Sequence, residues 1–342
     1  MRVMQVMAGA QNGGAEMFFE RLTGALQETA IEQKVVIRKD PARALRLSQA
    51  GIKASQLPFG GRLDIYTPFG LRCINKHFNP DVVLTWMNRA SRMMPRTTGV
   101  HVARLGGFYD LKYYRDCDHL VGNTRGIVDY LVEQGWPADR VHYLPNFVAV
   151  ADVPPVPRAS LNTPDGVPLL LSMGRLHANK AFDVLIEAMV EVKDTHLWIA
   201  GEGPERLSLE TLAYNRGVDD RVRFLGWRQD ISALLRACDV YVCPSRHEPL
   251  GNVVIEGWAA GKPVVSAASQ GPTELITHGE NGLLVPVDDA QGLAAALNDV
   301  LSEPDTVERL SAGGMSSYQQ LFTKESVVEQ YLSFFRHVTG AA

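Results

Sequence analysis

The sequence predicts an α/β protein made of two doubly wound, parallel-sheet domains that face a cleft. Short apolar runs alternate with segments of helical apolar spacing in both halves, a pattern typical of parallel sheets covered by helices. A proline-rich stretch with few large apolar side chains, residues 151–166, separates the halves. The length of 342 residues is that of about two domains.

The composition is that of an ordinary globular protein. The chain is 46% hydrophobic and 21% charged, and no run approaches the length of a membrane span. Its apolar start is short and interrupted by Gln5, which favours a first strand over a secretion signal. The four cysteines have no metal-type spacing and are expected to be reduced thiols in the cytoplasm.

The net charge of −4 hides an asymmetry between the halves. Residues 1–150 have 19 Lys and Arg against 13 Asp and Glu, whereas the remainder has 15 against 25. A basic first half favours an anionic ligand or an anionic membrane surface, although chance variation among solvated side chains gives the same count. The positive charges are not interleaved with aromatic residues, so no nucleic-acid partner is expected.

The first half begins with a strand and a Gly-rich loop, residues 9–16. Glycine between a strand and a helix lets the backbone approach a phosphate, and a tight turn is the alternative. Further strands are expected at 34–38, 81–86, 100–105, 118–122 and 141–147, and helices at 17–26, 42–50, 69–78 and 125–134. Because ligands gather at the carboxyl ends of parallel strands, Asn88 and Arg89, after one strand, are ligand-site candidates. Arg92 and Arg96 follow Arg89 at helical spacing and could bind an acidic or phosphorylated group with it; an exposed basic helix face is the alternative.

The second half repeats the alternation. Strands are expected at 167–173, 197–200, 222–225, 239–244, 262–265 and within 281–286, and helices at 181–192, from 271, at 288–301 and at 325–338. Arg175 and Lys180 lie five residues apart at a strand-to-helix turn, where two cations can hold a diphosphate. Ordinary surface charges are the alternative.

The stretch on which the functional prediction depends is residues 248–256, Glu-Pro-Leu-Gly-Asn-Val-Val-Ile-Glu. Apolar runs flank it, so it is expected to be a loop that enters a helix. Gly251 and Asn252 leave the first backbone N–H groups open to an anion. Glu248 and Glu256 would lie roughly 80° apart around an ideal helix and could reach different parts of one ligand. Two solvated acids at a helix start are the alternative.

Several of these motifs together resemble the retaining glycosyltransferases of family 4, which have the GT-B fold of two Rossmann-like domains. Four motifs carry the resemblance. They are Glu-Pro-x-Gly at 248–251 with the second Glu at 256, Gly-Arg-Leu at 174–176 before Lys-Ala-Phe-Asp-Val-Leu-Ile at 180–186, Gly-Glu-Gly-Pro at 201–204, and Pro-Asn at 145–146. It is strong over residues 170–286 and thin over residues 1–110.

The resemblance implies an enzyme that transfers a sugar from a nucleotide-diphosphate sugar to an acceptor hydroxyl. It implies a hexosyltransferase that needs no metal or other cofactor, and no Asp-x-Asp pair suggests a metal site. The implied catalytic residues are Glu248, which binds the sugar, and Arg175 and Lys180, which hold the diphosphate; Glu256 binds the ribose. The implied donor-binding residues are Gly13, Gly14, Gly174, Gly226, Trp227, Leu250, Gly251, Asn252, Val253 and Glu256. A packed core tryptophan is the alternative for Trp227.

The chain departs from the family where a catalytic His usually ends the strand at 100–105. Gly106 and Gly107 stand there and, with Asn88 and Arg89, are the acceptor-site candidates. His101, near the start of that strand, is not given the catalytic role.

The expected domains are an acceptor-binding domain (1–150), a linker (151–166), a donor-binding domain (167–322) and a helix that returns to the first domain (323–342). For that helix an oligomer contact is the alternative. The expected acceptor is a glycan or lipid-linked sugar, such as lipopolysaccharide, and the expected location is the cytoplasm, with peripheral contact at an anionic membrane. Two other functions stay open: a nucleotide-sugar epimerase of similar architecture and a non-catalytic nucleotide or sugar binding protein.

Overall fold

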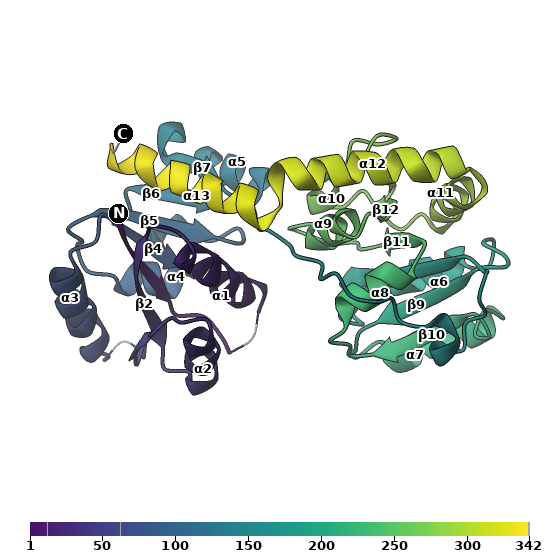
Figure 1. The fold of residues 1–342 in the computed structure, drawn as a ribbon, viewed down its shortest axis with the longest axis horizontal. Coiled ribbons are helices and arrows are strands. Elements are labelled where there is room, and N and C mark those ends of the chain that lie inside the picture. Colours follow the sequence, from purple (N-terminus) through teal and green to yellow (C-terminus); the bar gives the residue numbers. More distant parts are fainter. Residues whose placement is uncertain (12, 62, 341–342) are drawn as a thin grey trace. The chain divides into compact units, whose positions relative to one another are not determined.

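The computed structural model describes residues 1–11, 13–61 and 63–340, which form two compact units (Figure 1). Unit 1 combines Met1–Phe147 with the segment that starts at Lys324, and unit 2 is Val148–Thr323. Each unit is a parallel sheet with helices on both faces. The predicted fold class, two doubly wound α/β domains, is therefore confirmed.

Unit 1 has a seven-stranded sheet in the order β3-β2-β1-β4-β5-β6-β7, with every pair parallel. Its strands are β1 (Arg2–Met7), β2 (Glu32–Arg38), β3 (Ser55–Leu57), β4 (Val82–Trp86), β5 (Val100–Leu105), β6 (His119–Gly122) and β7 (Val141–Tyr143). Its helices are α1 (Gly14–Gln27), α2 (Pro41–Gln49), α3 (Tyr66–Phe78), α4 (Met87–Met93), α5 (Arg125–Glu133) and α13 (Lys324–Thr339). The strand order reverses between β1 and β4, the position where such sheets bind ligands.

Alternating side chains of β1 build the core on the two faces of this sheet. Val3 and Met7 pack into one buried cluster, and Met4 and Val6 pack into another. Both clusters exclude water because helices cover both faces, which explains why the strands are continuous apolar runs.

The C-terminal helix α13 is part of unit 1. Its apolar side chains, Val327, Val328, Tyr331, Phe334 and Phe335, are buried in the core of this unit. Nε of the buried Arg104 on β5 donates a hydrogen bond to the Tyr331 hydroxyl at 2.8 Å. The apolar side of this helix is therefore used within unit 1 and does not need a second copy of the chain.

Unit 2 has a six-stranded parallel sheet in the order β10-β9-β8-β11-β12-β13. Its strands are β8 (Leu169–Met173), β9 (His196–Ala200), β10 (Val222–Gly226), β11 (Val240–Cys243), β12 (Val264–Ala267) and β13 (Leu283–Val285). Its helices are α6 (Phe182–Ala188), α7 (Arg206–Asn215), α8 (Ile231–Ala237), α9 (Asn252–Ala259), α10 (Gln270–Leu275), α11 (Ala290–Ser302) and α12 (Pro304–Leu321).

Residues 151–166, which we expected to be a linker, lie in unit 2. Arg158 donates to the carbonyl oxygen of Ala237 at 2.7 Å and pairs with Asp239 at 2.7 Å. The backbone N–H of Val156 donates to the carbonyl oxygen of Ala233 at 3.1 Å. These bonds fix the proline-rich stretch to the helix α8 side of unit 2.

Candidate active site

The predicted donor residues of unit 2 lie at the carboxyl edge of its sheet. Gly174 follows β8, Gly226 ends β10, and Glu248 lies in the loop between β11 and α9. Because these strands are all parallel, the turns that follow them share one edge.

Lys180 and Glu248 form an ion pair at this edge. The Lys180 ammonium donates to Oε2 of Glu248, whose side chain is only 9% exposed. Sixty-eight residues separate them in the sequence. The sequence predicted both as catalytic residues, and the structure places them in direct contact.

The loop after β11 holds the Lys180 turn in place. Arg246 donates from Nη1 to the carbonyl oxygen of Ala178 at 2.8 Å, and the N–H of His247 donates to the carbonyl oxygen of Asn179 at 3.1 Å. Both bonds reach η4 (Ala178–Lys180), the short helix that contains the lysine. These two bonds hold the backbone before Lys180 against the loop that carries Glu248.

Close backbone packing shapes the rest of the donor site. Gly251, with φ 66°, precedes α9, and Leu250, Asn252 and Val253 beside it are half-buried. The N–H of Gly271 donates to the carbonyl oxygen of Glu248 at 2.7 Å, and a Cβ on Gly271 would lie 2.5 Å from the Gly251 nitrogen. The loop around Glu248 is thus packed directly on the start of α10.

The carboxylates of Glu256, in α9, and Glu248, in the loop before α9, both act on the phenol of Tyr241 on β11. Burial raises the pKa of Tyr241 well above its usual range, and the negative charges of Glu256 and Glu248 raise it further. The Tyr241 hydroxyl is buried and has no hydrogen-bond partner within the described ranges. Both acids come from the segment that follows β11, and their action on different parts of one ligand stays a prediction.

Arg175 and Trp227 extend from the same edge into solvent. Arg175 is exposed and forms no hydrogen bond or ion pair with the part of the chain that the structure describes. Trp227 is 76% exposed, so the alternative of a packed core tryptophan is wrong. An exposed indole after the Gly226 turn is free to stack on a planar ring.

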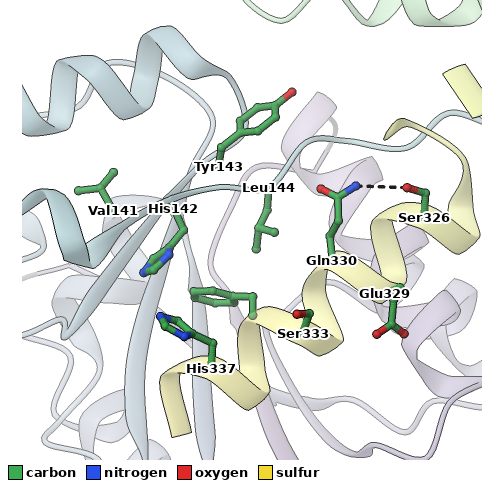
Figure 2. A pocket seen from close by; sticks show the side chains of 10 residues that line it. Val141, His142, Tyr143, Leu144, Ser326, Glu329, Gln330, Ser333 and His337 are labelled. Carbon is green, nitrogen blue, oxygen red and sulfur yellow. Dashed lines mark hydrogen bonds between the residues drawn. The ribbon is translucent and has the colours of Figure 1, made fainter. Parts of the chain in front are cut away.

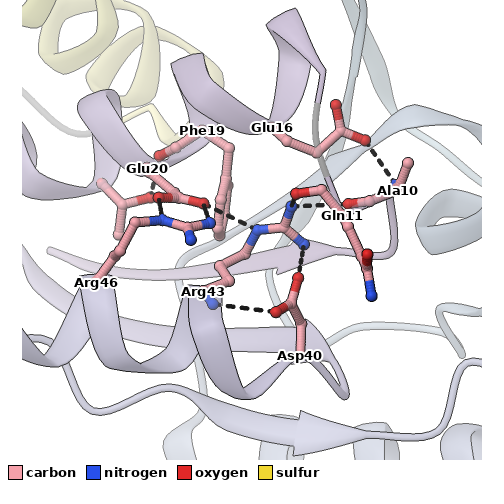
Figure 3. A network of polar contacts seen from close by, with 9 residues as sticks. Ala10, Gln11, Glu16, Phe19, Glu20, Asp40, Arg43 and Arg46 are labelled. Atoms are coloured by element: carbon pink, nitrogen blue, oxygen red, sulfur yellow. Dashed lines mark hydrogen bonds and ion pairs between the residues drawn. The ribbon is translucent and has the colours of Figure 1, made fainter. Parts of the chain in front are cut away.

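The Gly-rich loop of unit 1, apart from residue 12, which lies outside the described residues, is held by a polar network (Figure 3). The buried Arg43 on α2 donates from Nη2 to the carbonyl oxygens of Ala10 at 2.7 Å and Gln11 at 3.1 Å, and from Nε to Glu20 at 3.0 Å. From the other side, the buried carboxylate of Glu16 accepts the N–H of Ala10 at 2.7 Å. The loop is clamped between two helices.

Two glycines of this loop, Gly9 and Gly13, pack against the side chain of Glu16. A Cβ would lie 2.1 Å from the Glu16 carboxylate at Gly9 and 2.3 Å from it at Gly13, whereas Gly14 faces open space. Gly13 and Gly14, predicted for the donor, lie in unit 1, and the other predicted donor residues lie in unit 2.

The predicted acceptor residues follow neighbouring strands of unit 1. Asn88 and Arg89 lie in α4 after β4, and Gly106 and Gly107 follow β5. Nη1 of Arg89 donates to the carbonyl oxygen of Phe59 at 3.4 Å. Nδ2 of Asn123, a residue that follows β6 and was not predicted for the site, lies 3.8 Å from a Cβ placed on Gly106. These residues share the carboxyl edge of the sheet.

A small pocket of about 170 Å³, which was not predicted from the sequence, also lies at this edge. The loop residues 9–11 line it together with Arg38 and Lys39, which end and follow β2, and with Asp40 and Arg43, which pair with each other at 3.4 Å. The side chains of Arg38 and Lys39 are exposed and have no ion-pair partner among the described residues. A sequence signal was available, since two cations stand at the carboxyl end of a predicted strand.

His101 lies at the other end of the sheet. It is buried near the start of β5, and burial lowers the pKa of its imidazole. Its Nε2 is 3.1 Å from the Thr85 hydroxyl. His101 therefore lies away from the carboxyl ends of the strands, where the predicted site residues are.

A more open pocket of about 840 Å³ lies between β7 and α13 and contains none of the predicted site residues (Figure 2). His142 and His337 face one another there, with ring centroids 6.0 Å apart. Burial, followed by the charges of His119 and His337, lowers the pKa of His142 to about 4. The Lys180–Glu248 ion pair lies elsewhere, at the carboxyl edge of the unit 2 sheet, and that edge is the candidate donor site.

Comparison with known proteins identifies the family. Residues 156–316 match the family model described as glycosyl transferases group 1. The chain is 38% identical to the lipopolysaccharide core biosynthesis glycosyltransferase LpsE of Rhizobium meliloti (strain 1021), over 94% of this chain and 95% of that protein. It is also 38% identical to LpsD of the same organism, over 98% of each. The chain belongs to the group 1 glycosyltransferases.

Solved structures place this glycosyltransferase in the GT-B fold. Anabaena Alr3699/HepE in complex with UDP is 20% identical and matches with a TM-score of 0.85 over 98% of this chain and 100% of that one. A glycosyltransferase from Rickettsia africae ESF-5 is 18% identical and matches with a TM-score of 0.87 over 100% and 99%. At these identities the likeness concerns the fold alone.

Two features are absent from residues 1–11, 13–61 and 63–340 of the glycosyltransferase, a membrane-spanning helix and a metal-binding group of side chains. No helix there is both long and apolar enough to cross a bilayer. No three His, Cys, Asp or Glu side chains there form a group that could hold a metal ion.

Proposed function

We propose that this glycosyltransferase moves a sugar, with retention of anomeric configuration, from a nucleotide-diphosphate sugar to a hydroxyl of a lipopolysaccharide-core or related acceptor. The names of the relatives LpsE and LpsD support the acceptor class, and the UDP complex of the Anabaena protein supports the donor class. The observation that carries the proposal is the contact between Lys180 and Glu248 beside the start of α9.

In this mechanism unit 2 stabilises the departing nucleotide. The bond between the anomeric carbon and the β-phosphate oxygen breaks, and negative charge develops on that oxygen. Lys180, Arg175 and the N–H groups at the start of α9 stabilise this charge, a role that other enzymes give to a divalent cation. We therefore propose that transfer needs no metal.

The remaining groups hold the donor and direct the attack. Glu248 binds the sugar hydroxyls, Glu256 binds the ribose, and Trp227 stacks on the base. No protein nucleophile is assigned. The acceptor oxygen bonds to the anomeric carbon on the face from which the phosphate leaves, and the acceptor proton passes to the departing phosphate. We place the reaction in the cytoplasm, at the inner face of the membrane.

Incubation with candidate nucleotide sugars, without an acceptor, tests the proposed reaction. We expect slow hydrolysis of one donor, with release of the nucleoside diphosphate, because water can replace the acceptor. Conversion of the sugar to its epimer would instead indicate an epimerase. Tight binding without any turnover, with or without glycan acceptors, would indicate a binding protein.

Replacing Trp227 with alanine should weaken donor binding and leave the fold intact. Loss of base stacking costs about 1–3 kcal/mol, which corresponds to an increase in Kd of about 5- to 150-fold. The melting temperature should not change, because the indole is exposed. Calorimetric titration of the nucleoside diphosphate measures the effect, and Tyr214→Ala, at an exposed aromatic residue on α7, is the matched control. An unchanged Kd would contradict the role.

We propose that Arg38 and Lys39 bind an acidic group of the acceptor in the pocket beside the Gly-rich loop. The double variant Arg38→Ala, Lys39→Ala should raise the KM for an anionic acceptor by about 100-fold or more, because it removes two charge-assisted hydrogen bonds of about 1.5 kcal/mol or more each. Donor hydrolysis should be unaffected. Lys53→Ala, an exposed lysine outside the pocket, is the control. Equal KM values for the two variants would exclude the subsite.

A further inference from the structure

Unit 1 exposes a group of large apolar side chains at the start of α3. Leu63 is 94% exposed, Ile65 and Tyr66 are each 74% exposed, and Phe69 is 68% exposed. Single exposed apolar residues are common on protein surfaces, but four within seven residues of sequence form a patch. Such patches mark surfaces that bind a partner or a membrane.

The segment that carries this patch is held in a defined shape. The Asp64 carboxylate accepts hydrogen bonds from the N–H of Gly60 at 2.6 Å and from the N–H of Thr67 at 2.9 Å. Phe59 and Thr67 are both fully buried, and the Phe59 N–H donates to the Thr67 hydroxyl at 2.8 Å. The hydrogen bonds from Thr67 hold the pKa of Asp64 below its usual range. The apolar side chains therefore face solvent because the local fold directs them there.

Basic side chains continue the same face along α3. Arg72 and Lys76 follow Phe69 at helical spacing, and both are exposed. Neither forms an ion pair or hydrogen bond with any residue the structure describes. Helix α3 itself contains no Asp or Glu, and the Asp64 carboxylate before it accepts the N–H groups of Gly60 and Thr67, so this face has an apolar end and a positive end.

We propose that Leu63, Ile65, Tyr66 and Phe69, together with Arg72 and Lys76, form a docking surface for an anionic phospholipid bilayer. Apolar and aromatic side chains enter the boundary between headgroups and acyl chains, while cations pair with lipid phosphates. A second copy of the chain fits less well, because a symmetric contact would bring Arg72 and Lys76 of both copies together. The surface extends the proposed function, since a lipid-linked acceptor lies at such a membrane.

Sedimentation of the full chain with lipid vesicles tests the docking surface. The chain should bind vesicles of phosphatidylcholine mixed with phosphatidylglycerol more tightly than vesicles of phosphatidylcholine alone. Ile65→Ser with Phe69→Ser should lower the partition coefficient by about tenfold or more, because the inserted apolar area is lost. Arg72→Gln with Lys76→Gln should lower binding to the anionic vesicles and its dependence on salt.

Leu207→Ser with Tyr214→Ser, two equally exposed apolar residues of α7 in unit 2, is the matched control and should bind like the unmodified chain. Equal vesicle binding by the α3 and α7 variants, or no preference for anionic vesicles, would overturn the proposal. A dimer that is abolished by the α3 variant would show that the surface serves a second copy. Donor hydrolysis by the α3 variants should be unchanged. Vesicle binding therefore tests the docking surface, and donor hydrolysis tests the proposed transfer reaction independently of it.

Discussion

Replacing Gly201 with alanine should lower the free energy of unfolding of unit 2 by about 4 kcal/mol, the sum of a strained backbone and an overpacked contact. A Cβ at this position would lie 1.8 Å from the carbonyl oxygen of Gly174, a backbone atom that cannot swing away. The Gly201 N–H also donates to the carbonyl oxygen of Gly226 at 2.9 Å. The substitution therefore displaces two predicted donor-site turns, and donor binding should weaken as well.

Gly217→Ala is the matched control for this substitution. Gly217 also lies in unit 2 and has φ 65°, but a Cβ there meets nothing within 4 Å. Only backbone strain remains, which costs about 1–2 kcal/mol. Urea unfolding, followed by tryptophan fluorescence, measures both variants. A similar decrease in the free energy of unfolding for both variants would contradict a contribution from the close contact between Gly174 and Gly201.

Replacing Lys180 with glutamine should lower kcat/KM by on the order of 100- to 1,000-fold, the usual effect of removing one group that stabilises a developing anion. Glutamine keeps a hydrogen-bond donor near Glu248 but removes the charge that the leaving diphosphate needs. Steady-state transfer or donor hydrolysis measures the loss. Lys193→Gln, at an exposed lysine elsewhere in unit 2, should behave like the unmodified enzyme.

A double variant separates a catalytic role of Lys180 from a structural one. If Lys180 only compensates the buried charge of Glu248, Lys180→Gln with Glu248→Gln should recover both the stability and the affinity for a nucleoside diphosphate, because the unpaired buried charge is gone. A nucleoside diphosphate has no donor sugar for Glu248 to bind, so its affinity reports on Lys180. If Lys180 acts on the diphosphate, the double variant should recover stability alone. Recovery of the affinity would contradict the proposed mechanism.

The fold was predictable from the sequence because its strands are continuous apolar runs between turns. No element was predicted for residues 304–321, where the structure has α12. The Gly-Gly and Ser-Ser pairs in this segment obscure the helical pattern. The structure explains the two glycines. A Cβ at Gly314 would lie 2.3 Å from the Trp258 ring, and a Cβ at Gly313 would lie 2.2 Å from the carbonyl oxygen of Glu280. Tertiary packing requires glycines that a local reading takes for helix breakers.

The site was predictable only in part. Motif spacing placed Glu248, Lys180 and Glu256 in one region, since each follows a strand of the same parallel sheet. It could not predict that Lys180 and Glu248 would pair directly, because that contact depends on Arg246 and His247 holding the turn before Lys180. The sequence also could not show that Gly9 and Gly13 pack against Glu16. That contact exists only once α1 and the loop before it have folded.

Titration of the common nucleoside diphosphates into the enzyme, in buffer with EDTA, tests most directly whether unit 2 holds a donor diphosphate through its own cations. One diphosphate should bind without any divalent ion. The Arg175→Ala, Lys180→Ala variant should bind it about 100-fold more weakly, since two charge-assisted hydrogen bonds together contribute about 3 kcal/mol. Binding that requires an added divalent cation, or equal affinity in the variant, would contradict the account.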